Sequence, residues 1–100
     1  MKIKFLEEAE EELIGQIDYY EDKVSGLGID FYNEVKEAVF MIEASPQVWP
    51  VKRYKCRRFV LSRFPFTIHY YIKESVIWIV AVANTSREPH YWKDRAGDKA

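Results

Sequence analysis

The hydrophobic period of the chain changes near residue 55, and this change constrains the fold more than any other feature of the sequence. Between Leu6 and that point, apolar residues recur every three or four positions, as they do on one face of an α-helix. After it, apolar and polar residues alternate, as they do along a β-strand. A helical half followed by a strand half is typical of the α+β class, in which helices cover one face of an antiparallel sheet.

Two helices are predicted in the first half of the chain. The first begins at Leu6 and ends near Lys23, and acids load its first turns, where negative charge stabilises a helix by about 0.3–1 kcal/mol per group. The second runs from about Gly28 to Ala44 and ends at Ser45-Pro46, because a residue before proline is forced out of the helical region. The short connection makes the pair an antiparallel hairpin. The stripe of the first helix comprises Leu6, Ala9, Leu13, Ile17 and Tyr20.

Four strands are predicted, one before the helices and three after them. On the middle strand of the last three, we expect Phe66, Ile68, Tyr70 and Ile72 to face the helices and His69 to face away from them. The predicted order is β-α-α-β-β-β, an N-terminal helical hairpin packed on a twisted antiparallel sheet, in a single domain over residues 1–100. The predicted strands are Lys2–Phe5, Arg57–Leu61, Phe66–Ile72 and Val76–Ala83.

Composition excludes several classes of protein. An apolar fraction of 48% with 16% aromatic residues excludes a disordered segment. Cys56 is the only cysteine, so an intramolecular disulfide and a four-cysteine zinc site are excluded, and we interpret Cys56 as a strand residue rather than a nucleophile. We expect no metal and no cofactor. The longest apolar run, Val76–Ala83, is too short to span a membrane, and no signal segment precedes it, so we expect a cytoplasmic protein.

Acids and bases lie in different halves of the chain, although the net charge is only −1. Residues 1–47 hold twelve acids and four lysines, whereas residues 48–100 hold eleven bases and four acids. This asymmetry predicts a surface for an acidic partner or a polyanion, unless the two halves neutralise each other across the fold. The bases concentrate at Lys52, Arg53, Lys55, Arg57, Arg58 and Arg63.

Two long segments carry a resemblance to a known family. The run RRFVLSRFPFTIHYYI (Arg57–Ile72), followed by VIWIVAVANTSREPHYW (Val76–Trp92), resembles the RelE/ParE superfamily of bacterial toxins and is closest to its ParE-like branch. The tail is similar to a His-x-x-Arg-x-Pro-x-x-Trp pattern, with Asn84 in the place of the histidine. That departure removes an acid–base group from the position. The other matching positions are Arg87, Pro89 and Trp92.

The resemblance implies a growth-inhibiting toxin of a type II toxin–antitoxin system, neutralised by a cognate antitoxin. Members of the RelE-like branch cleave messenger RNA on the ribosome, whereas members of the ParE-like branch inhibit DNA gyrase and are not known as nucleases. The partners that follow are the antitoxin and either gyrase or the ribosome with its mRNA. A third alternative is an inert binding module or a toxin relic that is kept for its regulatory role with the antitoxin.

Candidate site residues follow from both branches. A nuclease would use Arg87 to hold the phosphate and Tyr91 or His90 as acid or base, with His69 a further candidate. The residues that we name for a nuclease site are Arg58, Arg63, Arg87 and Tyr91. Binding of the target or the antitoxin is predicted at Lys52, Lys55, Arg57, Arg58, Arg63, Arg87 and Trp92. An antitoxin groove could use Tyr19, Tyr20, Tyr32 and Trp49, although each of these aromatic residues could equally pack in the core or at its rim.

Net charge helps to choose between the two branches. Binding to ribosomal RNA depends on neutralising phosphates, and proteins that do this carry a positive excess. This chain is slightly acidic and its helical half is strongly so, which opposes close approach to RNA. The sequence therefore favours the ParE-like function over the RelE-like alternative.

Overall fold

A computed structural model describes residues 1–95, and its elements follow the predicted order. Each helix and strand begins and ends within one residue of its predicted bounds, because the change of hydrophobic period marks them clearly. None of the helices in this range has the length and apolar character needed to cross a membrane. The elements are β1 (Lys2–Phe5), α1 (Glu7–Lys23), α2 (Leu27–Ala44), β2 (Arg57–Val60), β3 (Phe66–Lys73) and β4 (Val76–Asn84), with short 3-10 helices at Arg53–Lys55 and Lys93–Arg95.

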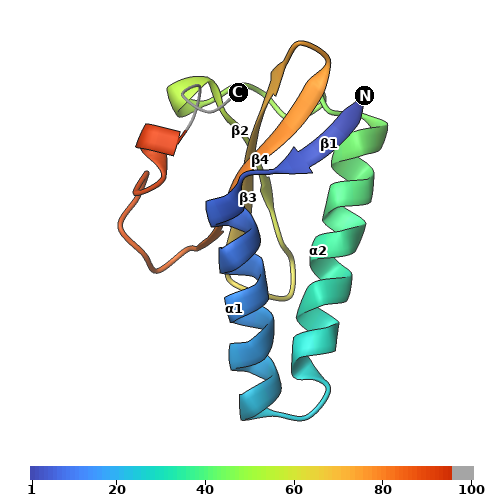
Figure 1. Ribbon diagram of the computed structural model, residues 1–100, viewed down its shortest axis with the longest axis vertical. Coiled ribbons are helices and arrows are strands. Elements are labelled where there is room, and N and C mark those ends of the chain that lie inside the picture. The colour runs from blue at the N-terminus through green and yellow to red at the C-terminus, as the bar shows by residue number, and fades with distance from the viewer. Residues whose placement is uncertain (96–100) are drawn as a thin grey trace.

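The four strands form one sheet in the order β1-β4-β3-β2 (Figure 1). The neighbours β2–β3 and β3–β4 are antiparallel, as predicted. β1 instead runs parallel to β4, with Lys2 opposite Val76 and Phe5 opposite Ile79, so the sheet is mixed rather than wholly antiparallel. Strands joined by tight turns must run antiparallel, but β1 reaches β4 through two helices and two strands, and no turn dictates its direction.

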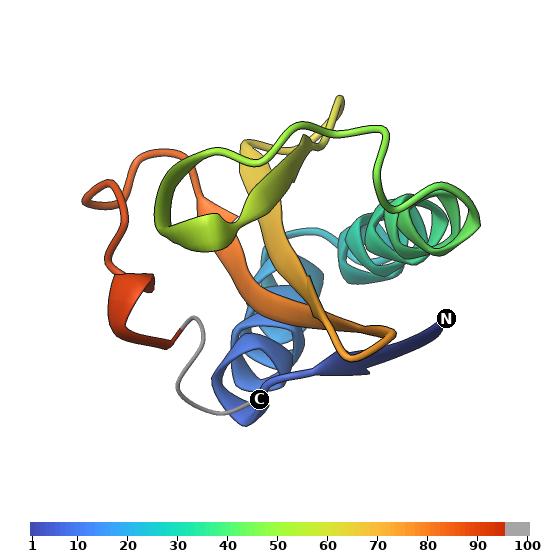
Figure 2. The same ribbon diagram turned by 90° about the horizontal axis from the view of Figure 1, so that it is seen from above.

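The two helices cover one face of the sheet and enclose the core (Figure 2). Phe31 of α2 is fully buried and packs against Phe66 of β3 and Phe64, with ring centroids 4.9 and 5.2 Å away. Tyr20 of α1 joins the same cluster. The contact of Phe66 with Phe31 of α2 confirms that Phe66 faces the helices, as predicted. Figure 2 shows the C-terminal segment, in red, away from α2.

The α1–α2 turn brings the two helices into close backbone contact. The Glu21 carboxylate accepts hydrogen bonds from the backbone N–H groups of Gly26 and Gly28, at 2.8 and 3.0 Å. Gly26 has a φ of 90°, which a side chain would disfavour. A Cβ atom added at Gly28 would lie 2.5 Å from the carbonyl oxygen of Ile17. Glycine at this position is therefore required by packing.

A β-bulge interrupts the pairing of β3 with β4. His69 lies opposite Ala81, but the next residue, Tyr70, lies opposite Ile79, so Val80 is the extra residue. A bulge leaves backbone groups of the extra residue without a strand partner. This irregularity lies where the C-terminal segment meets the sheet.

The β3–β4 turn predicts a stabilising substitution. Glu74 and Ser75 have φ values of 52° and 64°, and a two-residue turn with two positive φ angles favours glycine and asparagine. Ser75→Gly should raise the free energy of unfolding by about 0.5–1 kcal/mol, because only glycine adopts this conformation without steric cost. Urea unfolding would measure the gain. Ser75→Ala serves as the control, and an equal gain in that variant would contradict the backbone explanation.

Candidate functional site

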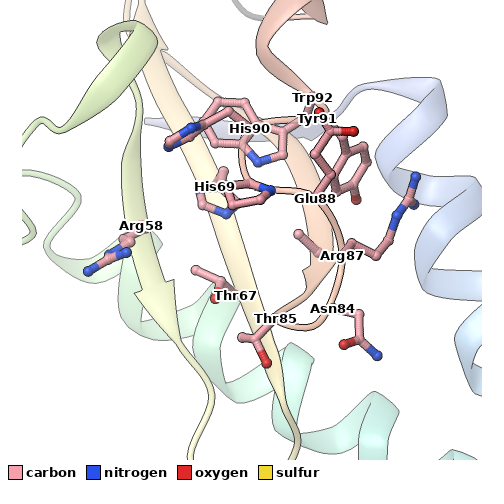
Figure 3. A pocket seen from close by; sticks show the side chains of 12 residues that line it. Arg58, Thr67, His69, Asn84, Thr85, Arg87, Glu88, His90, Tyr91 and Trp92 are labelled. Carbon is pink, nitrogen blue, oxygen red and sulfur yellow. The ribbon is translucent and has the colours of Figure 1, made fainter.

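The sheet face opposite the helices carries a pocket of about 210 Å³ (Figure 3). β2 contributes Arg58, β3 contributes Thr67 and His69, the end of β4 contributes Ala83 and Asn84, and the segment 85–92 forms the remaining wall. Arg58 and Arg87 lie on opposite sides of it in Figure 3. Three of the four nuclease candidates, Arg58, Arg87 and Tyr91, thus line one pocket.

His69 lies beneath Trp92 at the inner end of this pocket. The two rings are 4.3 Å apart, and Trp92 is only 3% exposed. His69 faces away from the helices, as predicted, but the C-terminal segment covers it. Burial, together with the nearby charges of Arg58 and His90, lowers the pKa of His69 to about 4. The imidazole is therefore neutral at pH 7 and supplies no cationic acid to a leaving group.

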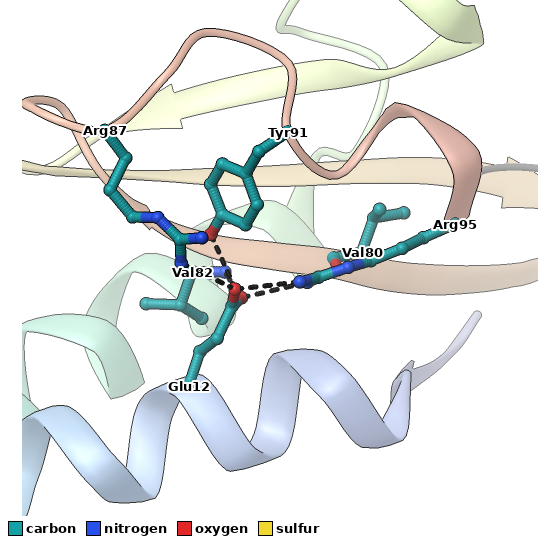
Figure 4. Close-up of polar contacts among 6 residues, drawn as sticks. All are labelled: Glu12, Val80, Val82, Arg87, Tyr91 and Arg95. Atoms are coloured by element: carbon teal, nitrogen blue, oxygen red, sulfur yellow. Dashed lines mark hydrogen bonds and ion pairs between the residues drawn. The ribbon is translucent and has the colours of Figure 1, made fainter.

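Glu12 of α1 gathers the C-terminal segment around its carboxylate (Figure 4). It accepts a 2.6 Å hydrogen bond from the Tyr91 hydroxyl and two hydrogen bonds, 3.0 and 3.1 Å, from the Arg95 guanidinium. Arg87 lies 3.8 Å from the same carboxylate and stacks on the Tyr91 ring at 3.7 Å. We call Glu12, Arg87, Tyr91 and Arg95 the Glu12 cluster.

The Glu12 cluster opposes a role as a base for Tyr91. Burial raises the pKa of Tyr91, and its hydrogen bond to Glu12 and the negative charge of Glu12 raise it further. A phenol that donates to a carboxylate keeps its proton, so it cannot abstract one from a 2′-hydroxyl. Arg87 remains 55% exposed, but part of its charge is balanced by Glu12.

The cluster also closes the free edge of β4 beyond β1. β1 pairs with β4 only as far as Ile79. The next backbone groups along this edge form hydrogen bonds with side chains instead of a strand. Val82 N–H donates to Glu12 at 3.1 Å, and the Val80 carbonyl accepts from Arg95 at 3.1 Å. Two charged side chains thus take the place of a neighbouring strand.

Glu12 and Arg95 were not among the residues predicted from the sequence. Glu12 is one of several acids in α1, and its partners lie 70 to 83 residues away along the chain. One signal was available: Glu12 follows Ala9 by three positions, so it borders the apolar stripe rather than the solvated face. Nothing in the sequence marked Arg95.

The predicted basic residues fall into different structural settings. Arg57 donates to the backbone carbonyls of Trp49 and Gln47, at 2.5 and 3.2 Å, and so holds the segment before β2. Arg63 pairs with Asp30 at 3.8 Å and lies beside α2, outside the pocket.

Other predicted basic residues lie near Arg58. Lys52 and Arg53 join Arg58 and His69 around a smaller cavity of about 40 Å³ next to the pocket. Lys55 is exposed in the 3-10 turn. The structure therefore brings Lys52 and Arg58 together and places Arg63 elsewhere.

The aromatic candidates for an antitoxin groove are dispersed. Tyr20 belongs to the core cluster, and Trp49 packs on Phe59 with ring centroids 5.0 Å apart. Tyr19 and Tyr32 are exposed on α1 and α2. These four residues therefore lie in different surroundings, two packed against other aromatic rings and two exposed on the helices.

Two further residues have structural roles. Cys56 is buried, and desolvation raises its pKa to about 12, so a thiolate does not form at neutral pH. Asn84, which stands where the resemblance has a histidine, accepts hydrogen bonds through Oδ1 from the N–H and hydroxyl of Ser86, at 2.8 and 2.7 Å. Asn84 therefore shapes the turn that leads β4 into the C-terminal segment.

Comparisons with known proteins agree with this fold. The chain matches the family described as ParE toxin of type II toxin-antitoxin system, parDE, over residues 3–89. A chain from the chromosomal ParDE TA system of P. aeruginosa has the same fold, with a TM-score of 0.64 and 21% identity, covering 84% of this chain and 95% of that chain. No curated protein sequence matches. Since the family match spans most of the sequence, the chain belongs to the ParE family of type II toxins.

Proposed function

We propose that this toxin stops growth by inhibiting DNA gyrase and that it does so without cleaving RNA. Membership of the ParE family supports the proposal, because the ParE-like branch is the one associated with gyrase. The net charge of −1 agrees with it, since a ribosome-entering nuclease needs a positive excess. Inhibition of gyrase would place the protein in the cytoplasm, where its target acts on DNA.

The hydrogen bond from Tyr91 to Glu12 is the observation that carries the proposal. RNA cleavage without a metal needs a base for the 2′-hydroxyl and an acid for the leaving oxygen. Tyr91 keeps its proton on Glu12, and His69 is neutral beneath Trp92. Tyr91 therefore lacks the deprotonated state that a base needs, and His69 lacks the protonated state that an acid needs.

A supercoiling assay tests the proposal directly. Purified toxin is incubated with gyrase, ATP and relaxed plasmid, and we expect supercoiling to fall as the toxin concentration rises. A cell-free translation reaction with mapped transcript ends serves as the parallel measurement, in which we expect no new cuts. Unchanged supercoiling at excess toxin would contradict the proposal. New cuts at codon positions that disappear in Arg87→Ala would show the RelE-like activity instead.

The antitoxin is the partner that the family assigns to this chain. We propose that its contact surface includes Lys52, Lys55, Arg58 and Arg87, because these predicted residues are exposed. Arg57, Arg63 and Trp92 are weaker candidates. Arg57 is engaged by backbone carbonyls, Arg63 lies beside α2, and Trp92 is buried.

A further inference from the structure

The pocket on the outer sheet face contains hydrogen-bonding groups with unused capacity. Within residues 1–95, no hydrogen bond or ion pair joins the side chains of Arg58, Thr67 or Thr85 to another protein group. Arg58 lines the β2 side of the pocket, and Thr67 and Thr85 line its wall (Figure 3). The Arg58 guanidinium points away from the two threonines in this view, and its exposed side chain can rotate toward them. Groups of this kind lower the energy of a bound anion when they converge on one space.

The net charge of the side chains that line the pocket determines how many negative charges a bound anion should carry. Arg58 has no acidic partner among the described residues, and its charge contributes to the lowered pKa of His69 at the base of the pocket. Arg87 is partly balanced by Glu12 at 3.8 Å, and Glu88 adds one negative charge to the lining. Among the residues that line this pocket, the unbalanced positive charge is therefore close to one, which suits a carboxylate better than the multiple charges of a nucleic acid backbone.

We propose that this pocket binds one carboxylate group and that an acidic side chain of the antitoxin supplies it. The carboxylate would accept hydrogen bonds from the Arg58 guanidinium in a bidentate arrangement and from a hydroxyl of Thr67 or Thr85. The volume of about 210 Å³ accommodates a single side chain rather than a folded element. This inference rests on the antitoxin partnership of the family and not on the gyrase target.

Occupation of the pocket has a spectroscopic consequence at His69. Arg58 from β2 and His90 from the C-terminal segment both lower the pKa of this imidazole. Lys52 and Arg53, from the segment before β2, border the adjacent cavity with it. A carboxylate placed beside them would counter their effect, so the pKa of His69 should rise from about 4 when the pocket is filled. A bound neutral group would not produce this change.

A pair of matched peptides tests the inference on the purified toxin. The probes are acetyl-Ala-Asp-Ala-amide and acetyl-Ala-Asn-Ala-amide, which differ only in charge and one atom type. We expect the aspartate peptide to bind at least tenfold more tightly in an NMR titration and to shift the His69 imidazole resonances. Arg58→Gln should abolish that preference, whereas Arg63→Gln should retain it, because Arg63 lies beside α2 outside the pocket.

Three results would overturn the inference. Equal binding of the two peptides would show that charge is not recognised. An aspartate preference that survives in Arg58→Gln would place the site elsewhere. Inorganic phosphate binding tenfold more tightly than the aspartate peptide would show that the pocket takes a phosphoryl group, not a protein carboxylate. None of these assays contains gyrase, so their failure is separable from failure of the supercoiling experiment.

Discussion

Replacing Glu12 with alanine is expected to lower the free energy of unfolding by about 2–4 kcal/mol, as measured by urea denaturation. The Glu12 side chain is only 16% exposed and accepts from three protein groups: Val82 N–H, the Tyr91 hydroxyl and the Arg95 guanidinium. Without it, these half-buried donors lose their acceptor. Each unsatisfied buried donor costs about 1–3 kcal/mol.

The neighbouring Glu11 provides a matched control for this prediction. Glu11 is exposed on the same helix, so Glu11→Ala removes the same charge and the same number of atoms without touching the C-terminal segment. Its effect should stay within about 0.5 kcal/mol. If the two variants lose equal stability, the cost comes from the charge of α1 and not from the Glu12 cluster.

Gly28→Ala is expected to destabilise the protein by about 2–3 kcal/mol, because the new methyl group overpacks the helix hairpin. Its Cβ would lie 2.5 Å from the carbonyl oxygen of Ile17 and 2.9 Å from the Cβ of Glu21. Both of those atoms belong to the body of α1 and cannot rotate away. The helices would have to separate, and the packing of Phe31 would loosen with them.

Gly15→Ala is the matched control, and we expect it to raise the free energy of unfolding rather than lower it. Gly15 lies inside α1, and a Cβ built there meets no atom within 4 Å. Alanine should therefore raise the free energy of unfolding by about 0.5–1 kcal/mol through its higher helix propensity. Loss of stability in both variants would contradict the account of the hairpin contact.

Local patterns in the sequence were sufficient to predict the elements but not how their edges are closed. The bounds of α1, α2 and the strands follow from apolar spacing and from breakers such as Ser45-Pro46, which act over a few residues. The parallel direction of β1 depends on a contact between Lys2 and Val76, and no local pattern encodes it. The predicted order of helices and strands along the chain was therefore right, while the prediction that all strands are antiparallel was wrong.

The sequence suggested candidate residues for a site but not the contacts among them. The structure brings three of these residues, Arg58, Arg87 and Tyr91, to one pocket. The protonation state of Tyr91 could not be inferred, because it depends on Glu12, which lies 79 residues away along the chain. Charge partners so remote leave no periodic signal in a single sequence.

The parallel pairing of β1 with β4 has a consequence for the time at which the protein can fold during synthesis. β4 lies at the centre of the sheet and contacts β1, β3 and α1, so the core is incomplete until its residues have left the ribosome. Contacts between distant parts of a chain form late because the intervening loop must first be closed. An interrupted translation product that stops before Val76 would lack this strand and could not build the toxin. Completion of the polypeptide is thus a condition for toxicity that the topology itself imposes.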